Sequence, residues 1–197
     1  RGFRGEIVTT AASRELARLV LLDSARVNEE DARRRTRHGT RHGSKRPDVA
    51  PLYSVVDAMR SFDYFGRTAA YGHALELAPG VRVTFIDAGH ILGSACLLME
   101  LEEGNRRRRV LFSGDLGNDG RPLLRDPTPA PKSDVVVIET TYGDRLHKPI
   151  GPSVEELYAV IGDTFARRGN VVIPTFALER AQELLFYLRE GVESGRL

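Results

Sequence analysis

Three side chains that can bind a metal ion or transfer a proton stand out in this sequence by their position. His90 ends "DAGH" (87–90), Asp115 lies in "SGDLG" (113–117), and Glu139 opens "ETTYGDR" (139–145). Each follows an apolar run, with glycine close by. Imidazole and carboxylate are the usual ligands of zinc, and two ions about 4 Å apart can clamp the attacking and leaving oxygens of a phosphodiester. Because loops at strand ends converge above a rigid sheet, the pattern favours one shared site, in which Asp115 could bridge two ions.

Each of the three motifs taken singly also has a simpler interpretation. His90 could be a polar loop residue, "SGDLG" is typical of a turn, and "ETTYGDR" could be a strand end followed by a helix cap. One histidine and two carboxylates make an incomplete site for two metals. No pair among the remaining histidines has the His-x-His spacing of a zinc site: His38, His42, His73 and His147. The residue types and spacing alone therefore leave the reaction open.

The first third of the chain predicts a strand and two helices. Residues 6–9 read as a short strand, and 13–22 as a helix capped by Thr10 or Ser13. Residues 26–46 contain eight basic and three acidic residues. Their low apolar content predicts a loop or a frayed helix, either solvated or in contact with phosphates. Residues 53–62 predict a second helix.

The rest of the chain alternates strands and helices. Residues 81–86, 95–101 and 110–112 predict strands, with a turn at 103–105. Residues 134–139 and 170–174 are rich in β-branched residues, which predicts strands buried on both faces. Residues 153–168, capped by Ser153, and 177–189 predict helices. Strand hairpins followed by strand–helix alternation indicate a layered α/β protein.

Composition excludes several protein classes. The chain has 197 residues, 41% of them hydrophobic, and a net charge of +2. Its one cysteine, Cys96, excludes a disulfide framework and a cysteine zinc cluster, and predicts an ordinary buried thiol. No apolar run reaches the roughly 20 residues of a membrane span. We therefore expect a soluble, cytoplasmic protein, and the absence of an initiator methionine suggests a segment cut from a longer chain.

Four segments in order resemble one known family. They are "DAGHILGSA" (87–95), "FSGDLGNDGRPLL" (112–124), "IETTYGDRLH" (138–147) and "GNVVIPTFALERAQELLFYL" (169–188). Together they resemble the β-CASP branch of the metallo-β-lactamase superfamily, which contains RNA-processing nucleases such as the mRNA 3′-end endonuclease and ribonuclease J. The opening "GFRGEIVTTAASRELARLVLLDSARV" and the later "PLYSVVDAM" fit the same family. The arginine-rich stretch is the part of the chain that the resemblance does not cover.

The resemblance assigns roles to individual residues. It implies that His90 ligates one zinc, that Asp115 bridges two zincs, and that Glu139 supports a histidine ligand or a proton relay, so that these three form the catalytic set. Arg145 and Arg180 are the implied nucleic-acid contacts. Thr140 and Glu179 depart from the family pattern, which has serine and a small residue at these two positions.

The resemblance also implies a fold and a domain boundary. Residues 1–197 are expected to be part of an αββα sandwich, a partial metallo-β-lactamase domain truncated at both ends, with an inserted β-CASP domain beginning near or after 190. The family's His-x-His-x-Asp-His motif, which supplies most metal ligands, is absent from this sequence. The segment alone is therefore expected to be inactive.

The implied function of the full-length protein is zinc-dependent hydrolysis of single-stranded RNA, without a membrane partner and compatible with a homodimer. Two alternatives stay open, namely a hydrolase of small esters or thioesters with the same fold and a non-catalytic RNA-binding or scaffold paralogue. A DNA-repair nuclease of the same branch also fits the motifs. The sequence does not distinguish RNA from DNA, or endonuclease from exonuclease action.

Overall fold

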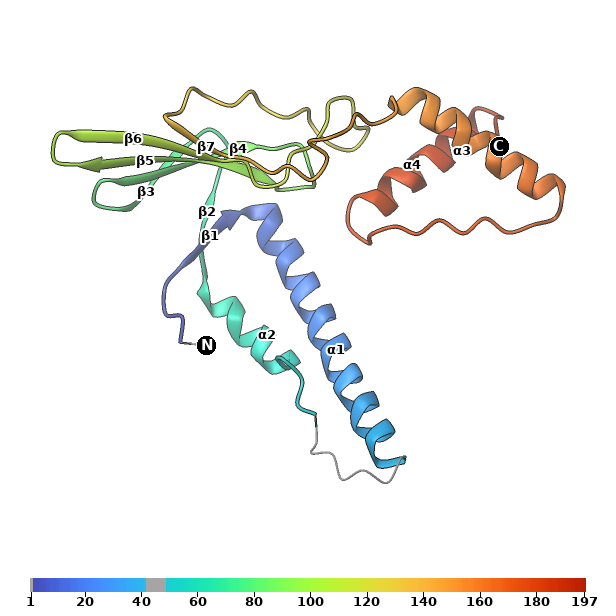
Figure 1. The fold of residues 1–197 in the computed structure, drawn as a ribbon, viewed down its shortest axis with the longest axis horizontal. Coiled ribbons are helices and arrows are strands. Elements are labelled where there is room, and N and C mark those ends of the chain that lie inside the picture. The colour runs from blue at the N-terminus through green and yellow to red at the C-terminus, as the bar shows by residue number, and fades with distance from the viewer. Residues whose placement is uncertain (1, 42–48) are drawn as a thin grey trace.

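In the computed structural model, which describes residues 2–41 and 49–197, two sheets lie at the centre of the chain (Figure 1). Strands β1 (Ile7–Thr10) and β2 (Phe65–Ala69) form a parallel pair. The second sheet has five strands in the order β3-β4-β5-β6-β7. Its strands are β3 (Ala74–Ala78), β4 (Val81–Asp87), β5 (Ala95–Glu103), β6 (Arg106–Phe112) and β7 (Val135–Val137). The pairs from β3 to β6 are antiparallel, whereas β7 runs parallel to β6.

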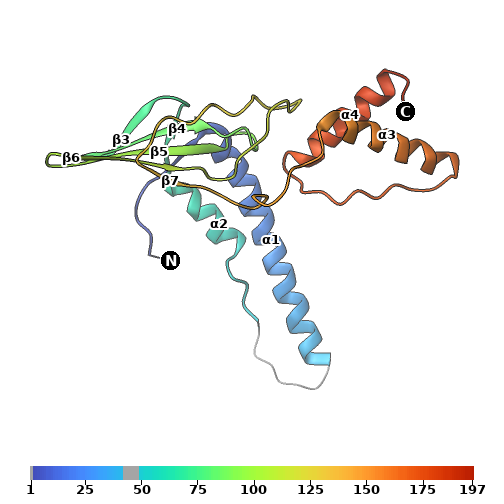
Figure 2. The same cartoon turned by 45° about the horizontal axis from the view of Figure 1, so that its top comes forward.

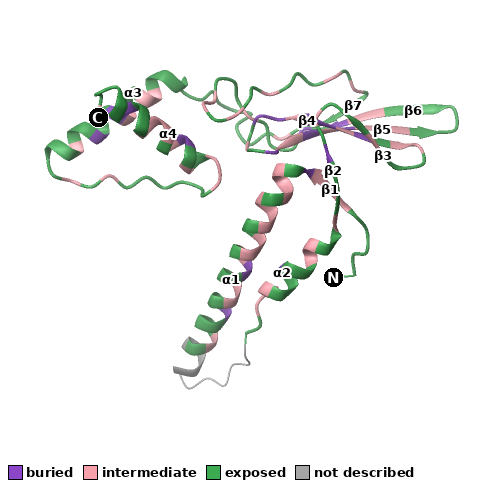
Figure 3. Cartoon of the chain, turned by 180° about the vertical axis from the view of Figure 1, so that it is seen from behind, coloured by how far each residue is buried: buried purple, intermediate pink, exposed green. Residues whose placement is uncertain are grey.

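Both faces of the five-stranded sheet carry buried apolar side chains, because successive residues of each strand point to opposite faces. Val83 and Phe85 of β4 pack with Ala69 of β2 and Val8 of β1, so one face lies against the two-stranded sheet. The opposite face carries a second buried cluster, made of Ile86, Ala88, Cys96, Leu98 and Leu111. Alternation with period two sends neighbouring residues of one strand to opposite faces. Figure 3 shows the buried residues concentrated in these central strands, and the predicted α/β class is confirmed.

A pair of helices projects from the small sheet and is called the helical arm below (Figure 1). It consists of α1 (Ala11–Arg41) and α2 (Val55–Ser61), followed by a 3₁₀ turn at Phe62–Tyr64. Thr10 is the predicted cap, since its hydroxyl accepts from Ser13 N at 3.1 Å. Ser54 and Asp57 form a capping box at the start of α2.

The arginine-rich stretch, predicted as a loop or a frayed helix, is helical as far as Arg41, where the 31-residue helix α1 ends. Ala25 and Ala32 are buried, and Figure 3 shows the buried positions of α1 on the side that faces α2. Glu29–Arg33 and Glu30–Arg34 pairs one turn apart, with N–O distances of 3.7 and 2.6 Å, add support. The contact with α2 therefore outweighs the weak apolar content of the helix. The remainder of that stretch, 42–46, lies outside the described residues.

The C-terminal helices α3 (Ile150–Ala166) and α4 (Arg180–Glu193) form a second pair, set apart from the arm in Figures 1 and 2. The start of α3 precedes the predicted one, since Ser153 lies in its first turn and donates to the Pro149 carbonyl at 2.9 Å rather than capping the helix. Helix α4 begins after Glu179, whose φ is +63°.

Two strands predicted to be buried are exposed. Val135–Val137 pair with β6 at the edge of the sheet, and each of the three is about half exposed. Residues 170–174 form an extended connection without strand pairing, in which Val172 is 88% exposed. Both segments are rich in β-branched residues, but the described elements leave them exposed, so the predicted burial is wrong for both.

Two compositional expectations have structural counterparts. Cys96 is buried in the sheet and free, as predicted, and burial raises the pKa of its thiol. In the described part of the chain, none of the helices combines the length and apolar character needed to cross a membrane.

Candidate metal centre

The loop that carries His90 is fixed by hydrogen bonds within itself. Strand β4 ends at Asp87, whose carboxylate accepts from Gly89 N at 3.0 Å. The Ser94 hydroxyl accepts from both His90 N and Ile91 N, at 3.1 and 3.2 Å. Gly89 has a φ of +61°, a conformation that favours glycine. The imidazole therefore starts from a defined backbone, and its side chain is 42% exposed.

The loop that carries Asp115 is tied to the end of β7. Ser113 N donates to the Val137 carbonyl at 2.9 Å, and the buried Ser113 hydroxyl accepts from Glu139 N at 3.0 Å. These bonds continue the parallel pairing of β6 with β7 beyond the strands themselves. Asp115 follows at once, and 76% of its side chain is exposed.

The same two loops touch each other main chain to main chain. Gly117 N donates to the Ala88 carbonyl at 2.9 Å. A Cβ atom on residue 117 would lie 1.7 Å from the Gly89 carbonyl oxygen, which no real side chain tolerates. The second glycine of "SGDLG" is therefore required for the Asp115 loop to approach the His90 loop.

His90, Asp115 and Glu139 meet at this junction, as their placement at strand ends predicted. His90 Nδ1 lies 3.3 Å from the Leu116 carbonyl oxygen. Because a carbonyl only accepts, this bond places the proton on Nδ1 and leaves the lone pair on Nε2. Nε2 in turn lies 3.9 Å from Asp115 Oδ2. Leu116 N donates to Glu139 Oε1 at 2.6 Å, so one peptide segment connects all three.

The hydrogen bond from Leu116 N is the main reason that the pKa of Glu139 is lowered from 4.5. A bond from the Thr141 hydroxyl and the neighbouring His90 act in the same direction, while burial opposes them. Glu139 is therefore a carboxylate at neutral pH. In that form it accepts hydrogen bonds and cannot supply a proton.

The donor atoms fit part of a zinc site. Zinc binds histidine nitrogen and carboxylate oxygen at about 2.0–2.2 Å, so two ligands of one ion lie at most about 4.4 Å apart, and the 3.9 Å between His90 Nε2 and Asp115 Oδ2 is within that span. A metal-binding histidine usually donates its other ring N–H to a carbonyl, as His90 does here. Zinc sites use three or four protein ligands, and no group of three or more such residues comes together within ranges 2–41 and 49–197. His90 and Asp115 thus offer two donor atoms where a zinc site uses three or four.

The two arginines expected to bind nucleic acid lie in different settings. Arg145 is exposed, pairs with Asp144 at 3.1 Å, and has its guanidinium 5.8 Å from the centre of the Tyr142 ring. Arg180 begins α4 and bonds to Glu183 Oε2 at 3.0 Å. Neither observation tests a contact with nucleic acid.

Glu183 belongs to a buried ion cluster that the sequence did not suggest. Its side chain is 5% exposed, and Arg121 Nη1 donates to its two oxygens at 3.1 and 2.9 Å. Arg121 follows Asp115 in the same loop, so the cluster ties that loop to α4. An arginine and a glutamate 62 positions apart give no sequence signal of their own.

Of the other histidine rings, the structure describes those of His73 and His147. His73 Nδ1 bonds to the Tyr71 carbonyl at 2.9 Å, and the His147 ring stacks edge-on against Tyr142 at 4.4 Å between centroids. His42 and the side chain of His38 lie outside the described residues.

The roles of the Leu116 main chain and of the Ser113 hydroxyl were not predicted from the sequence. The glycines and serine of "SGDLG" hinted at a constrained turn without identifying its partners.

Comparison with known proteins identifies the family. No family model matches the chain. It is 34% identical over 187 residues to ribonuclease TTHA0252 of Thermus thermophilus, covering 95% of this chain and 37% of that protein. It is 31% identical to transcription termination factor FttA of Methanothermobacter thermautotrophicus, covering 98% of this chain and 28% of the relative. It is 33% identical to endoribonuclease YSH1 of Candida glabrata, covering 95% of this chain and 22% of that protein.

The chain thus spans between about a fifth and just over a third of the length of these relatives. The similarity extends over nearly the whole chain and includes the segments that bring His90, Asp115 and Glu139 together. The chain belongs to the β-CASP branch of the metallo-β-lactamase superfamily.

Proposed function

We propose that this chain is part of a zinc-dependent phosphodiester hydrolase that acts on RNA. The observation that carries the proposal is the meeting of His90, Asp115 and Glu139 at three strand ends, with 3.9 Å between His90 Nε2 and Asp115 Oδ2. Two relatives are a ribonuclease and an endoribonuclease, which supports RNA as the substrate of the full-length protein.

His90 and Asp115 would hold the zinc, and further ligands come from the His-x-His-x-Asp-His motif that the family resemblance implies. Bound zinc supplies an activated water at neutral pH and polarises phosphoryl oxygens. His90 keeps its lone pair on Nε2 because its Nδ1–H donates to Leu116. Glu139, ionised, holds the Leu116 amide and so fixes the orientation of the ring. With two ligands, the isolated segment is expected to bind zinc weakly and to be inactive.

A location in the cytoplasm and assembly as a homodimer complete the proposal. Both rest on the resemblance to RNA-processing relatives. Sedimentation of the full-length protein tests the dimer, since a monomer over the working concentration range would remove that part.

The activity is tested by incubating the full-length protein and zinc with end-labelled single-stranded RNA, beside a DNA strand of the same sequence. Asp115→Ala is the test variant, and Asp163→Ala, an exposed carboxylate on α3, is the matched control. We expect RNA to be cut by the wild type and the control and spared by Asp115→Ala. Preferential cleavage of DNA would move the proposal to DNA repair. If neither strand is cut while zinc is bound, a small-ester hydrolase becomes the better account.

A further inference from the structure

The chain is strongly basic in the part of its sequence that begins in the last turns of α1. Residues 32–46 contain seven of its 29 lysines and arginines and none of its 27 acidic residues, so the rest of the chain is acidic on balance. Within the described part of this stretch, the side chains of Arg33, Arg34, Arg35 and Arg37 are exposed on α1. Such segregation of charge on one projecting element is typical of a surface that meets a polyanion.

A groove accompanies the charge. It has a volume of about 520 Å³ and lies between α1 and the segment that leads into α2. Ala32, Val49 and Pro51 give it apolar walls, and Arg33 and Arg37 line it one helical turn apart. An apolar groove beside two guanidinium groups suits a nucleotide, whose base can enter the groove while its phosphates meet the arginines.

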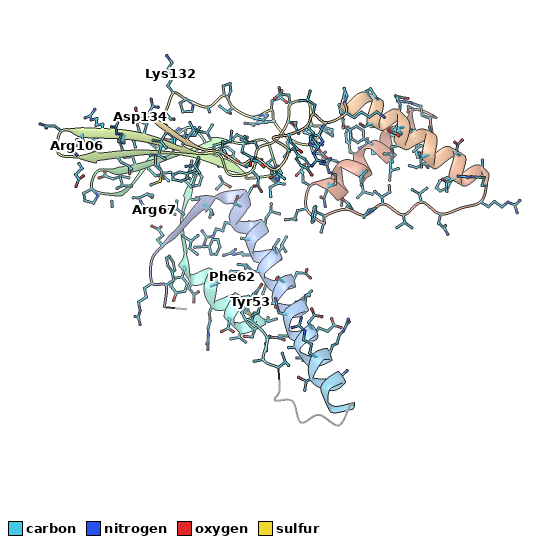
Figure 4. All side chains as sticks on the ribbon, viewed as in Figure 1. Tyr53, Phe62, Arg67, Arg106, Lys132 and Asp134 are labelled. Carbon is cyan, nitrogen blue, oxygen red and sulfur yellow. The ribbon has the colours of Figure 1, made fainter. Side chains whose placement is uncertain are left out.

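Polar contacts hold this region in place. Val49 N donates to the Thr36 hydroxyl at 3.2 Å, across the groove. Glu29, which also lines it, accepts from Val55 N at 2.9 Å and lies 3.7 Å from Arg33. The Tyr53 hydroxyl donates to Ser24 at 2.6 Å (Figure 4). These hydrogen bonds hold α1, one wall of the groove, against the segment that leads into α2, the other wall.

The arm is rooted next to the candidate metal centre. The Thr10 and Ser13 hydroxyls both donate to the Gly93 carbonyl, at 2.9 and 2.8 Å, and Gly93 belongs to the His90 loop. From Ala11 to Arg33, α1 rises by about 33 Å, at about 1.5 Å per residue. An RNA that reaches both places must be much longer than a trinucleotide.

We propose that the groove lined by Arg33 and Arg37 binds the phosphate backbone of single-stranded RNA at a distance from the metal centre. The identity of the ligand rests on the proposed function, whereas the charge and the groove do not. On a single strand, each phosphate contact that is lost lowers the slope of log binding constant against log salt concentration by about 0.7. The arm should therefore add affinity for long RNA and leave the chemistry of a short one unchanged.

The test uses the full-length protein with both arginines changed, Arg33→Gln/Arg37→Gln. The matched control is Arg106→Gln/Arg108→Gln, which removes the same charge from the β5–β6 hairpin, where Figure 4 places Arg106 far from the arm. Binding of a long single-stranded RNA is titrated at several salt concentrations, beside a DNA of the same sequence. Hydrolysis of the long RNA and of a trinucleotide is then followed.

For the arm variant we expect several-fold weaker binding of long RNA, a salt slope lower by about 1.4, a raised KM on long RNA, and unchanged kcat and trinucleotide hydrolysis. An equal loss on DNA still supports the groove, as a reader of phosphates rather than of the sugar. Binding of the arm variant equal to that of the hairpin control overturns the inference and leaves the arm to another partner. Binding is titrated without turnover, so it tests the role of the groove even if the wild type cuts no RNA. A lack of cleavage would contradict the proposed function and leave the inference about the groove intact.

Discussion

His90 and Glu139 are joined through the main chain of a third residue, Leu116. The Leu116 amide donates to Glu139 at 2.6 Å, and its carbonyl accepts from His90 at 3.3 Å. The acidic residue thus orients the histidine ring across one peptide segment, without touching it. The side chain at 116 takes no part in this connection, so its identity carries no signal in the sequence.

Removal of the Glu139 carboxylate should weaken metal binding without removing a ligand. We expect Glu139→Ala to lower zinc affinity by about 10–100-fold, the usual effect of losing a partner that orients a ligand. Glu139→Gln keeps an acceptor oxygen for Leu116 N and should recover part of the loss. Zinc affinity of the full-length protein is measured by competition with a chelator. Glu193→Ala, on the exposed face of α4, serves as the control, and equal affinities in all variants would refute the connection.

Acidification should loosen the same junction. The pKa of Glu139 in the folded chain lies below its usual 4.5, because Leu116 N and Thr141 bond to the carboxylate. The unfolded state therefore takes up the proton first. The stabilisation is complete above pH 4.5 and is lost as the pH falls through the lower, folded-state pKa. Urea unfolding at a series of acidic pH values should show a steeper loss for the wild type than for Glu139→Gln, and parallel curves would count against the assignment.

Gly117 should tolerate no side chain. A Cβ there meets the Gly89 carbonyl oxygen at 1.7 Å, so Gly117→Ala must push the Asp115 and His90 loops apart. We expect a cost of about 1–3 kcal/mol in the free energy of unfolding, together with loss of zinc binding. Gly162→Ala is the control, since a Cβ at this position in α3 meets open space and should stabilise the helix by about 0.5–1 kcal/mol. Normal zinc binding by Gly117→Ala would show that the close approach is dispensable.

The Arg121–Glu183 pair should contribute far more to stability than surface pairs do. Glu183→Ala leaves Arg121, whose side chain is 19% exposed, without its main partner, and breaking a buried pair in this way costs about 3–5 kcal/mol. Glu193→Ala, which breaks the exposed pair with Arg189, should cost less than about 1 kcal/mol. Urea unfolding of both variants gives the comparison. Similar costs for the two would mean that burial does not strengthen the Arg121 pair.

The sequence predicted the parts of the structure that depend on local pattern. Alternation located β4, an apolar run located β5, and the turn at 103–105 indicated that β6 follows in a hairpin. The placement of His90, Asp115 and Glu139 after strands favoured one shared site. A loop and a frayed helix both stayed open for the arginine-rich stretch, because the contact of α1 with α2, which is distant in sequence, leaves no local pattern. The exposure of Val172 was missed, since an apolar segment does not itself provide the neighbours that bury it. The link through Leu116 uses main-chain atoms, which every residue possesses.

The most direct test of this account is the rate of RNA cleavage by the full-length protein as zinc is titrated into the metal-free form, for the wild type and for Asp115→Ala. The account predicts a rate that rises with zinc to a plateau in the wild type and stays at background in the variant. Cleavage by the wild type that is indifferent to zinc, or a variant that matches it at every zinc concentration, would contradict the assignment of His90 and Asp115 to a catalytic metal centre.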